Sequence, residues 1–457
     1  MKKYKIIATA YYPGAEPKSA TLTILPNFEL KIKPLRKPKT FVPLRIPNFK
    51  GNTENKFIEF EIEILKHGID EFSIEILHND KVIYTAYSGK QVLDEVIITA
   101  KRTNTKVEKE NLEQVEEEET PMNYPIGKYA FKWDGFDRNG IYDSTLFTSG
   151  KLKARVKGKI SSVEKIAESE EFSFEYKEVK WVDVKIDENT KRIDVTLRVN
   201  LRDGGEIGTE KDCKEEVKID YLNPGLKSSK KVCPWDKIPK EDLISGRSPI
   251  KSRTKNFADL EQLALEGLNY HWGRNRNHFV AKNVDIHGEK YEVFVNSVNT
   301  TENAMDDISL IFNTNSDWLR SMNPGSVDGV ISFFGQVMPE RIIYNYGYIK
   351  EVKSWYWLGN NVSDVNDDFS YTSAHEIGHE ILKRFSNKDF YSYKHKGSST
   401  LSETLPASKG GVNYPMSGEI DLMKYYNNDP YWYDFKRIAA SKKDVLGLIW
   451  LGKLEIS

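Results

Sequence analysis

Two histidines and a glutamate fall within five consecutive residues, His375-Glu376-Ile377-Gly378-His379. In an α-helix, residues four apart lie on one face about one turn from each other, so both imidazoles could bind the same metal ion. The glutamate is rotated away by one residue, and it could accept a proton from a water molecule beside that ion. The spacing therefore predicts a hydrolytic metal centre on a helix.

The residues around this motif predict the helix itself. Apolar residues at spacings of three and four form one core-facing stripe, which consists of Ala374, Ile377, Gly378, Ile381, Leu382 and Phe385. Hydroxyl side chains favour helix N-caps, and the candidates just before the motif are Ser370, Thr372 and Ser373. Glycine costs helix stability relative to alanine, so Gly378 predicts a close neighbour, which we expect to be a strand.

The sequence H-E-I-G-H matches the pattern H-E-x-x-H and resembles the active-site helix of the zincin metallopeptidases. The match covers only five residues, on an amphipathic helix late in the chain. The resemblance implies tetrahedral Zn²⁺ held by His375, His379 and a third protein ligand, with water in the fourth position. It also implies that Glu376 acts as general base and acid while a peptide bond is hydrolysed.

The third zinc ligand is predicted to be His395, which is the only histidine after the motif. It follows His379 by sixteen residues. In the metzincin branch of the zincins this distance is six residues, so His395 would have to lie on a longer loop. The gluzincin branch uses a glutamate from a later helix instead, and Glu403 and Glu419 are the candidates for that arrangement.

A second similarity to metzincins lies at residues 421–426, Asp-Leu-Met-Lys-Tyr-Tyr. Metzincins have a methionine-containing turn under the metal, often followed by a tyrosine. Met423 and Tyr425 stand in that relation, so Tyr425 is predicted to donate a hydrogen bond to the developing oxyanion, with Tyr426 as the alternative. A methionine near tyrosines is also ordinary core composition, which is the other interpretation of this segment.

The first two-fifths of the chain read as β structure, including a period-two strand at 56–65 and a hairpin at 72–87. A charged insertion near 103–121 is expected to be solvated. Residues 127–156 resemble the Ig-like domain of the flagellar hook-capping family, with a strand, the turn W-D-G-x-D-x-x-G from Trp133, and an exit strand. The resemblance implies a structural or adaptor module without chemistry of its own.

Helical periodicity appears at 256–272, and strands follow at 290–298 and 307–314. We therefore predict a multi-domain chain, in which an N-terminal all-β region with an Ig-like sandwich precedes an α+β zincin-like catalytic domain. The predicted parts are an N-terminal β segment at 1–50, the sandwich at 51–180 and the metallopeptidase domain at 181–457.

Composition limits the other function classes. The chain has 457 residues, of which 30% are charged, with a net charge of −1, so no overall field favours nucleic acid. No apolar run reaches the ~20 residues needed to span a bilayer. The N-terminus reads as a strand, which predicts a cytoplasmic location in the producing cell or export without a cleavable signal. Cys213 and Cys233 could be free thiols or could form one disulfide bridge.

The predicted function is that of a zinc-dependent metallopeptidase, a hydrolase acting on a protein or peptide substrate. In layout, β modules before a late peptidase domain resemble exported bacterial effectors, including antibacterial toxins delivered by type VI secretion. That analogy implies secretion machinery and a cognate immunity protein as partners. Two alternatives stay open: a β-rich structural or adhesin protein with a degenerate H-E-x-x-H helix, and a zinc amidase acting on cell-wall peptides.

Overall fold

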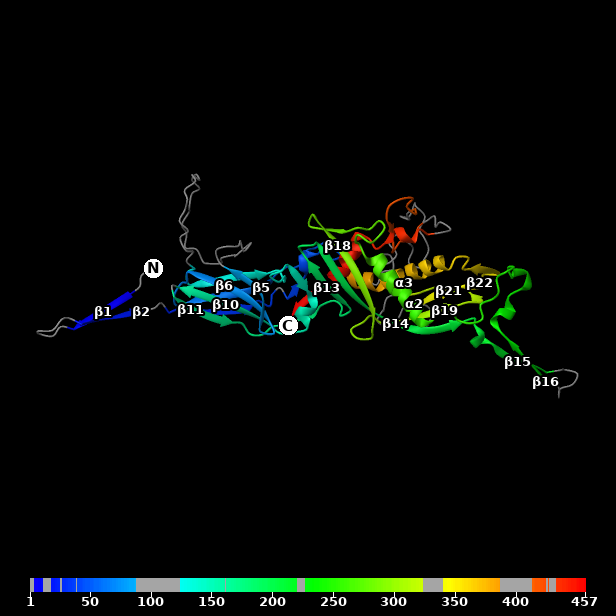
Figure 1. The fold of residues 1–457 in the computed structure, drawn as a ribbon, viewed down its shortest axis with the longest axis horizontal. Helices are drawn as coiled ribbons and strands as arrows, with labels where there is room; N and C mark the ends of the chain where they lie inside the picture. Colours follow the sequence, from blue (N-terminus) through cyan, green and yellow to red (C-terminus); the bar gives the residue numbers. More distant parts are fainter. Residues whose placement is uncertain are drawn as a thin grey trace. The chain divides into compact units, whose positions relative to one another are not determined.

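The structure is a computed structural model of the chain. It describes residues 4–10, 18–24, 27–37, 39–87, 124–160, 162–219, 227–323, 340–386, 413–424, 426 and 433–457. Within these ranges strands outnumber helices (Figure 1), which confirms the β-rich character predicted from the sequence. The chain forms two compact units: the first comprises 1–45, 55–175 and 454–457, and the second comprises 46–54 and 176–453.

Two antiparallel sheets form the main body of the described part of the first unit. Their strands are β3 (Glu29–Pro34), β5 (Ile58–Leu65), β6 (Glu71–His78), β7 (Lys81–Tyr87), β8 (Gly127–Trp133), β10 (Leu152–Ile160) and β11 (Val163–Glu168). The strand orders are β11-β10-β6-β7 and β3-β5-β8. Buried and half-buried residues alternate along β5, which confirms the predicted period of two. The rings of Tyr84 and Phe131, one from each sheet, lie 6.4 Å apart in the aromatic core.

Smaller elements complete this unit. They are β1 (Tyr4–Ala10), β2 (Lys18–Ile24), β4 (Thr40–Phe41), β9 (Ile141–Asp143), α1 (Ser144–Thr148), β12 (Phe174–Tyr176) and β26 (Leu454–Ile456). β1 and β2 form an antiparallel hairpin. β26 lies between β12 and β4, so the last strand of the chain belongs to the first unit.

Two predicted turns of the first unit are confirmed. The hairpin of β6 and β7 turns at Asn79 and Asp80, whose φ angles of 48° and 63° are those of a tight hairpin turn. After β8 the chain turns at Gly135, with φ of 85°, and a Cβ there would lie 2.9 Å from the Phe41 ring. The charged insertion near 103–121 lies outside the described residues.

The second unit contains a mixed sheet built on one long strand. Its strands are β13 (Val182–Asp187), β14 (Arg192–Ile207), β17 (Val284–Ile286), β18 (Glu289–Asn299), β19 (Asp307–Asn313) and β21 (Arg341–Asn345). β14 pairs antiparallel with β13, then parallel with β18 along its first half and with β19 along its second half. β21 continues the sheet, parallel to β19.

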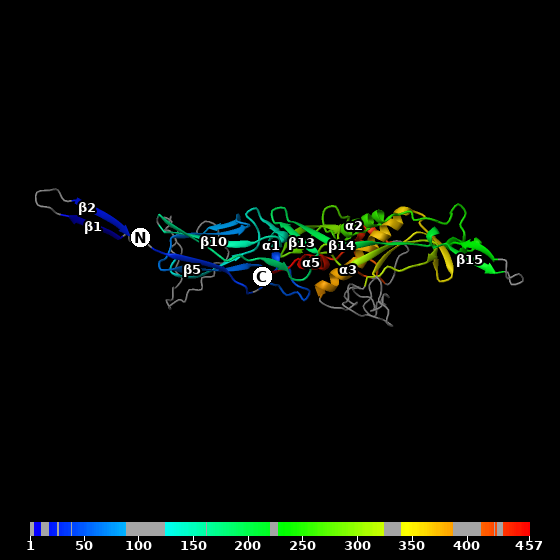
Figure 2. The same ribbon diagram turned by 90° about the horizontal axis from the view of Figure 1, so that it is seen from below.

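In the described part of this unit the α-helices are α2 (Phe257–Trp272), α3 (Val362–Ser386) and α5 (Lys442–Trp450). α2 and α3 lie side by side (Figures 1 and 2). They approach so closely that a Cβ on Gly267 would lie 2.1 Å from the Ser370 carbonyl oxygen. The Trp272 indole N–H donates to the Ala374 carbonyl at 3.1 Å. These contacts fix the position of α3.

Short sheets surround this core. They are β20 (Ser316–Asp317) with β22 (Gly347–Glu351) and β23 (Ser354–Leu358), β24 (Ile420–Asp421) with β25 (Ile438–Ala439), and the hairpin of β15 (Lys214–Ile219) and β16 (Lys227–Val232). A disulfide between Cys213 and Cys233 joins the two ends of that hairpin, which decides between the two interpretations of the cysteines. In the described ranges, no helix combines the length and apolar character needed to span a membrane.

Candidate functional site

The predicted helix around the H-E-x-x-H motif exists, but it begins earlier than expected. The three proposed N-cap residues lie inside α3: Ser370, Thr372 and Ser373. The side chain of Asn361 accepts a hydrogen bond from the Ser363 backbone N–H at 3.1 Å, where the helix starts. The Ser373 hydroxyl donates to the carbonyl of Phe369, one turn back, at 2.7 Å. The N-cap prediction was wrong because a Ser or Thr hydroxyl inside a helix can form its hydrogen bond with the carbonyl one turn earlier.

The apolar stripe of α3 is confirmed. Its members other than Gly378 are almost fully buried. Ala374, Ile377, Ile381 and Leu382 have 0% exposure, and Phe385 has 4%. Gly378 has a close neighbour as predicted, but the neighbour is not a strand. A Cβ on Gly378 would lie 2.6 Å from the Met423 sulfur and 3.0 Å from the Trp272 ring. A turn and α2 therefore occupy the space that the strand was expected to fill.

His375 is held in one tautomer by the backbone. Its Nδ1 lies 2.7 Å from the Leu422 carbonyl oxygen. A carbonyl can only accept, so Nδ1 carries the hydrogen and the neutral ring has its lone pair on Nε2. Burial lowers the pKa of His375 to about 4, although the hydrogen bond to Leu422 opposes this shift. The ring is therefore neutral at pH 7, which is the form that binds a metal ion.

His379 lies beside His375 on the next turn of α3. Their ring centroids are 4.8 Å apart with an interplanar angle of 82°, and each residue is 4% exposed. The structure therefore brings together two of the three predicted metal ligands, from the positions that the helical spacing indicated.

Glu376 is buried beside the His379 imidazole, with 8% exposure. Its Oε2 accepts a hydrogen bond from the Asn323 backbone N–H at 2.9 Å and lies 3.8 Å from His379 Nε2. Burial raises the pKa of Glu376 to about 7, while the Asn323 N–H and the charge of Arg320 act in the opposite direction. A carboxyl that titrates near neutral pH can both accept and return a proton.

Three of the predicted site residues, His395, Glu403 and Tyr425, lie outside the described residues. Glu419 is described, and its carboxylate binds the fully buried guanidinium of Arg274 at 2.6 Å. Among the residues that the structure describes, no group of three His, Cys, Asp or Glu side chains could hold a metal ion. The described part of the site thus provides two imidazole donors.

The predicted methionine turn packs against the motif. Asp421 accepts a hydrogen bond from the Met423 N–H at 3.0 Å, and the Asp421 N–H donates to the Tyr426 hydroxyl at 2.8 Å. The Leu422 N–H donates to the Ala439 carbonyl at 3.0 Å, which ties the turn to β25. This segment therefore positions both the carbonyl that meets His375 and the sulfur that lies against the motif glycine.

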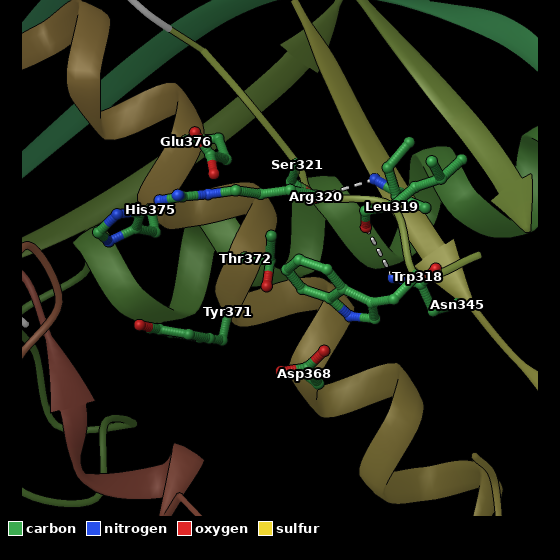
Figure 3. Close-up of a pocket in the computed structure, with 11 residues that line it drawn as sticks. Trp318, Leu319, Arg320, Ser321, Asn345, Asp368, Tyr371, Thr372, His375 and Glu376 are labelled. Carbon is green, nitrogen blue, oxygen red and sulfur yellow. Dashed lines mark hydrogen bonds between the residues drawn. The ribbon is translucent and has the colours of Figure 1, made fainter. Parts of the chain in front are cut away.

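A pocket of about 210 Å³ opens beside His375 and Glu376 (Figure 3). Residues 318–321, which follow β20, form one wall, and the first half of α3 forms the other. The Arg320 side chain extends toward His375 and Glu376 (Figure 3). No pattern in the sequence indicated this wall. It carries no motif, and Asn323 and Glu376 are 53 residues apart in the chain.

Two other buried histidines of this unit have structural roles. Nδ1 of His271 and Nε2 of His278 both contact the Ile438 carbonyl oxygen, at 2.8 and 3.1 Å. Burial lowers the pKa of both rings. Nδ1 of His278 also accepts hydrogen bonds from the N–H groups of Val280 and Ala281. Both ring nitrogens of His278 are engaged with the backbone, so this ring serves packing rather than metal binding.

The neutral His375 imidazole and a carboxyl that titrates near neutrality thus lie at one end of a pocket, and the His379 ring lies beside His375. Such a set can bind a divalent metal ion and exchange a proton with water. Comparison with protein-family models, with curated proteins and with solved structures finds no match to this chain.

Proposed function

We propose that this chain is a zinc-dependent peptidase whose site lies on α3. His375 and His379 would hold the zinc ion, and Glu376 would act as general base and acid. The third ligand would come from the residues outside the described ranges, with His395 as the leading candidate and Glu403 as the alternative. The observation that carries the proposal is the hydrogen bond between His375 Nδ1 and the Leu422 carbonyl.

This hydrogen bond is the outer contact that metal-binding histidines usually make. A ligand imidazole donates its other N–H to a carbonyl or carboxylate, which fixes the ring orientation and leaves the lone pair for the metal. A helix that only packed against a core would be expected to bury apolar side chains at such positions. Two histidines and a glutamate, each under 10% exposed, favour a chemical role over a degenerate motif.

The chain's own residues would handle the proton. Zinc would supply Lewis acidity, which lowers the pKa of water and polarises a carbonyl group. Glu376 would take a proton at its carboxylate and return it to the leaving amine. The Asn323 N–H holds Oε2 of that carboxylate at 2.9 Å and so fixes its orientation. Tyr425 keeps its predicted role as a hydrogen-bond donor to the oxyanion.

Glu419 is a weaker candidate for the third ligand than the sequence suggested. Its carboxylate neutralises Arg274, which is fully buried and also donates to the Ala440 carbonyl at 2.8 Å. Moving Glu419 to a metal would leave a buried guanidinium without its anion, which is costly. This contact favours His395 or Glu403 over Glu419.

The disulfide bears on where the peptidase would act. Disulfides persist in oxidising compartments and are rare in the reducing cytosol. The bridge between Cys213 and Cys233 therefore favours a working location outside the producing cytoplasm. This fits the proposed exported effector, whose partners would include secretion machinery and an immunity protein.

Metal analysis of the purified chain tests the proposal. We expect about one zinc per chain, as in other three-ligand catalytic sites, and its loss in His375→Ala and His379→Ala. The matched control is His67→Ala, because His67 is an exposed histidine of the first unit and should not affect zinc. Glu376→Gln should retain zinc and lose peptide cleavage.

The alternatives give different results. A wild-type chain that takes up no zinc even on titration would contradict the peptidase and favour a structural protein. A zinc-loaded chain that cleaves cell-wall peptides but no protein would identify an amidase. Full activity in Glu376→Gln would show that Glu376 is not the general base.

A further inference from the structure

The pocket beside the motif follows one face of α3 (Figure 3). Asp368, Thr372 and Glu376 are spaced by four residues, so they form one row over two turns, about 12 Å of helix. Tyr371 and His375 form the adjacent row, and all five residues line the pocket. The pocket therefore extends from the carboxyl of Glu376 toward the start of the helix.

The opposite wall is held on the neighbouring strands. The Trp318 N–H donates to the Lys350 carbonyl in β22 at 2.7 Å. The Ile343 N–H in β21 donates to the Ser321 hydroxyl at 2.9 Å. The Trp318 side chain nevertheless remains 50% exposed. A fixed backbone thus presents an indole ring to whatever enters the pocket.

The two ends of the pocket carry opposite charges. Arg320 extends to the end occupied by Glu376 and His375, and its positive charge acts on both. Asp368 lies at the other end, and Trp318 lies between them in the view of Figure 3. Asp368 is exposed, and it makes no hydrogen bond or ion pair with any residue in the ranges that the structure describes.

We propose that this pocket binds a lysine or arginine side chain of the substrate residue next to the cleaved bond, with Asp368 pairing with its charge. The proposal rests on the peptidase function inferred above. Lysine and arginine carry their charge at the end of a long apolar stem, which suits a pocket that reaches from the site to a distant carboxylate. The exposed indole of Trp318 favours a cation over an anion.

The charge distribution of the pocket disfavours an acidic side chain at the end near Asp368. An acidic side chain reaching that end would face the negative charge of Asp368 without a compensating cation from the pocket lining. At the near end, the charges of Arg320 and Glu376 offset each other. A neutral peptide backbone near Glu376 with a cationic side chain near Asp368 therefore matches the pocket along its length.

Binding can be measured without turnover in the Glu376→Gln variant. Calorimetric titration with Nα-acetyl-L-lysine amide and with Nα-acetyl-L-norleucine amide compares a charged side chain with an uncharged one of similar length. We expect the lysine amide to bind about tenfold or more tightly, the range of one charge-assisted hydrogen bond. Adding Asp368→Asn should bring it to the level of the norleucine amide.

The matched control is Asp367→Asn, because Asp367 is the neighbouring exposed acid of α3 and does not line the pocket. It should leave the preference for the lysine amide unchanged. Equal binding of the two amides, or a lysine preference that survives Asp368→Asn, would overturn the proposal.

Turnover gives a second measurement. In peptides that differ only at one residue beside the cleaved bond, kcat/KM should be about ten- to a hundredfold higher for lysine than for methionine. Asp368→Asn should remove that ratio while methionine peptides react as before, and Asp368→Lys should favour glutamate. A wild-type preference for glutamate that disappears in Arg320→Gln would assign the pocket to acidic side chains instead.

The two proposals fail in different ways. A chain without zinc or cleavage would defeat the peptidase function, yet the difference between the lysine and norleucine amides would still decide what the pocket prefers. An active zinc peptidase that is indifferent to Asp368→Asn would retain its function and lose the proposed specificity.

Discussion

Two glutamates with the same 8% exposure, one in each unit, show how differently the units treat a buried charge. Glu75 in β6 accepts hydrogen bonds from Arg155 at 3.2 Å and Lys157 at 2.5 Å, so two cations neutralise it. Glu376 in α3 accepts a hydrogen bond from a backbone N–H and lies 3.8 Å from the His379 ring, and burial outweighs the opposing charge of Arg320. The buried carboxylate of Glu75 is therefore stabilised by its ion pairs, whereas burial raises the pKa of Glu376 to about 7.

The contrast extends to the surroundings of each carboxylate. The sheets of the first unit pair their acids with lysines across neighbouring strands, as Glu61 does with Lys33 and Lys128 at 2.9 and 3.2 Å. In the second unit, a row of polar groups on α3 faces a pocket instead. Regions that depart from ordinary burial rules are where function is expected, because the cost of burying such groups must be offset elsewhere.

The largest effect is expected when each of these two glutamates is replaced by glutamine in the zinc-free protein. Below pH 4.5 Glu376 is protonated whether folded or unfolded, so the variant should gain nothing there. As pH rises from 4.5 to the folded pKa of about 7, the unfolded carboxyl ionises before the buried one does, so stability is lost over this range. At pH 8, Glu376→Gln should therefore raise the free energy of unfolding by about 3 kcal/mol.

Glu75→Gln should act in the opposite direction. It removes the carboxylate that Lys157 binds and leaves Arg155 with Glu168 at 2.6 Å. We expect the free energy of unfolding to fall by about 1–3 kcal/mol, less than for a fully buried pair because both cations are partly exposed. Urea unfolding of each variant at pH 4 and pH 8 measures both effects. Changes of the same sign at pH 8 would mean that the two carboxylates do not differ in this way.

The next largest effect is expected at the motif glycine. Gly378→Ala places a Cβ 2.6 Å from the Met423 sulfur and 3.0 Å from the Trp272 ring, so the buried Met423 side chain, the turn or the helix must shift, at a cost of about 2 kcal/mol. Zinc affinity should fall as well, because the same turn supplies the Leu422 carbonyl to His375. Thermal unfolding and zinc titration measure these two effects.

A second substitution tests whether contact with Met423 causes the loss of stability in Gly378→Ala. Met423→Ala removes the side chain that the new Cβ would strike, so the double variant should lose less stability than the sum of the two single variants. If the two losses simply add, the contact between Gly378 and Met423 does not position the motif.

The sequence predicted those parts of the site whose contacts are local. Periodicity along α3 indicated the buried stripe, and the spacing of His375 and His379 indicated their shared face. The start of α3 was missed because its first turns are polar and mostly exposed, so they show no stripe. The Leu422 carbonyl is a backbone group that any residue provides, so no residue type could indicate it.

Strand pairing likewise could be predicted where the two strands are close in sequence, but not where they are far apart. Alternation and turn residues identified the hairpin of β6 and β7 within one stretch of sequence. The parallel pairing of β14 with β18 and β19 joins segments about a hundred residues apart, and no local pattern encodes it. The wall at 318–321 was missed for the same reason, because its place beside α3 depends on this sheet.

Acid should affect the second unit through His375. An unfolded histidine titrates at 6.5, whereas burial holds the folded pKa at about 4, so stability present above 6.5 is lost as pH falls toward 4. Between pH 7.5 and pH 5.5 this residue should account for about 1 kcal/mol of lost unfolding free energy. His375→Gln should remove that part of the pH dependence. His67→Gln, at an exposed position, should leave it unchanged.

The smallest effect is expected on the surface of the first unit. Glu61→Gln breaks contacts to Lys33 and Lys128, but both lysines are more than half exposed and water competes for them. The loss of unfolding free energy should be about 0.5 kcal/mol, and it should nearly vanish in 1 M salt, where charges are screened beyond about 3 Å. Glu75→Gln should keep most of its larger cost in the same salt, because Glu75 is buried between its partners. Equal costs for the two variants would show that burial does not determine what a carboxylate contributes here.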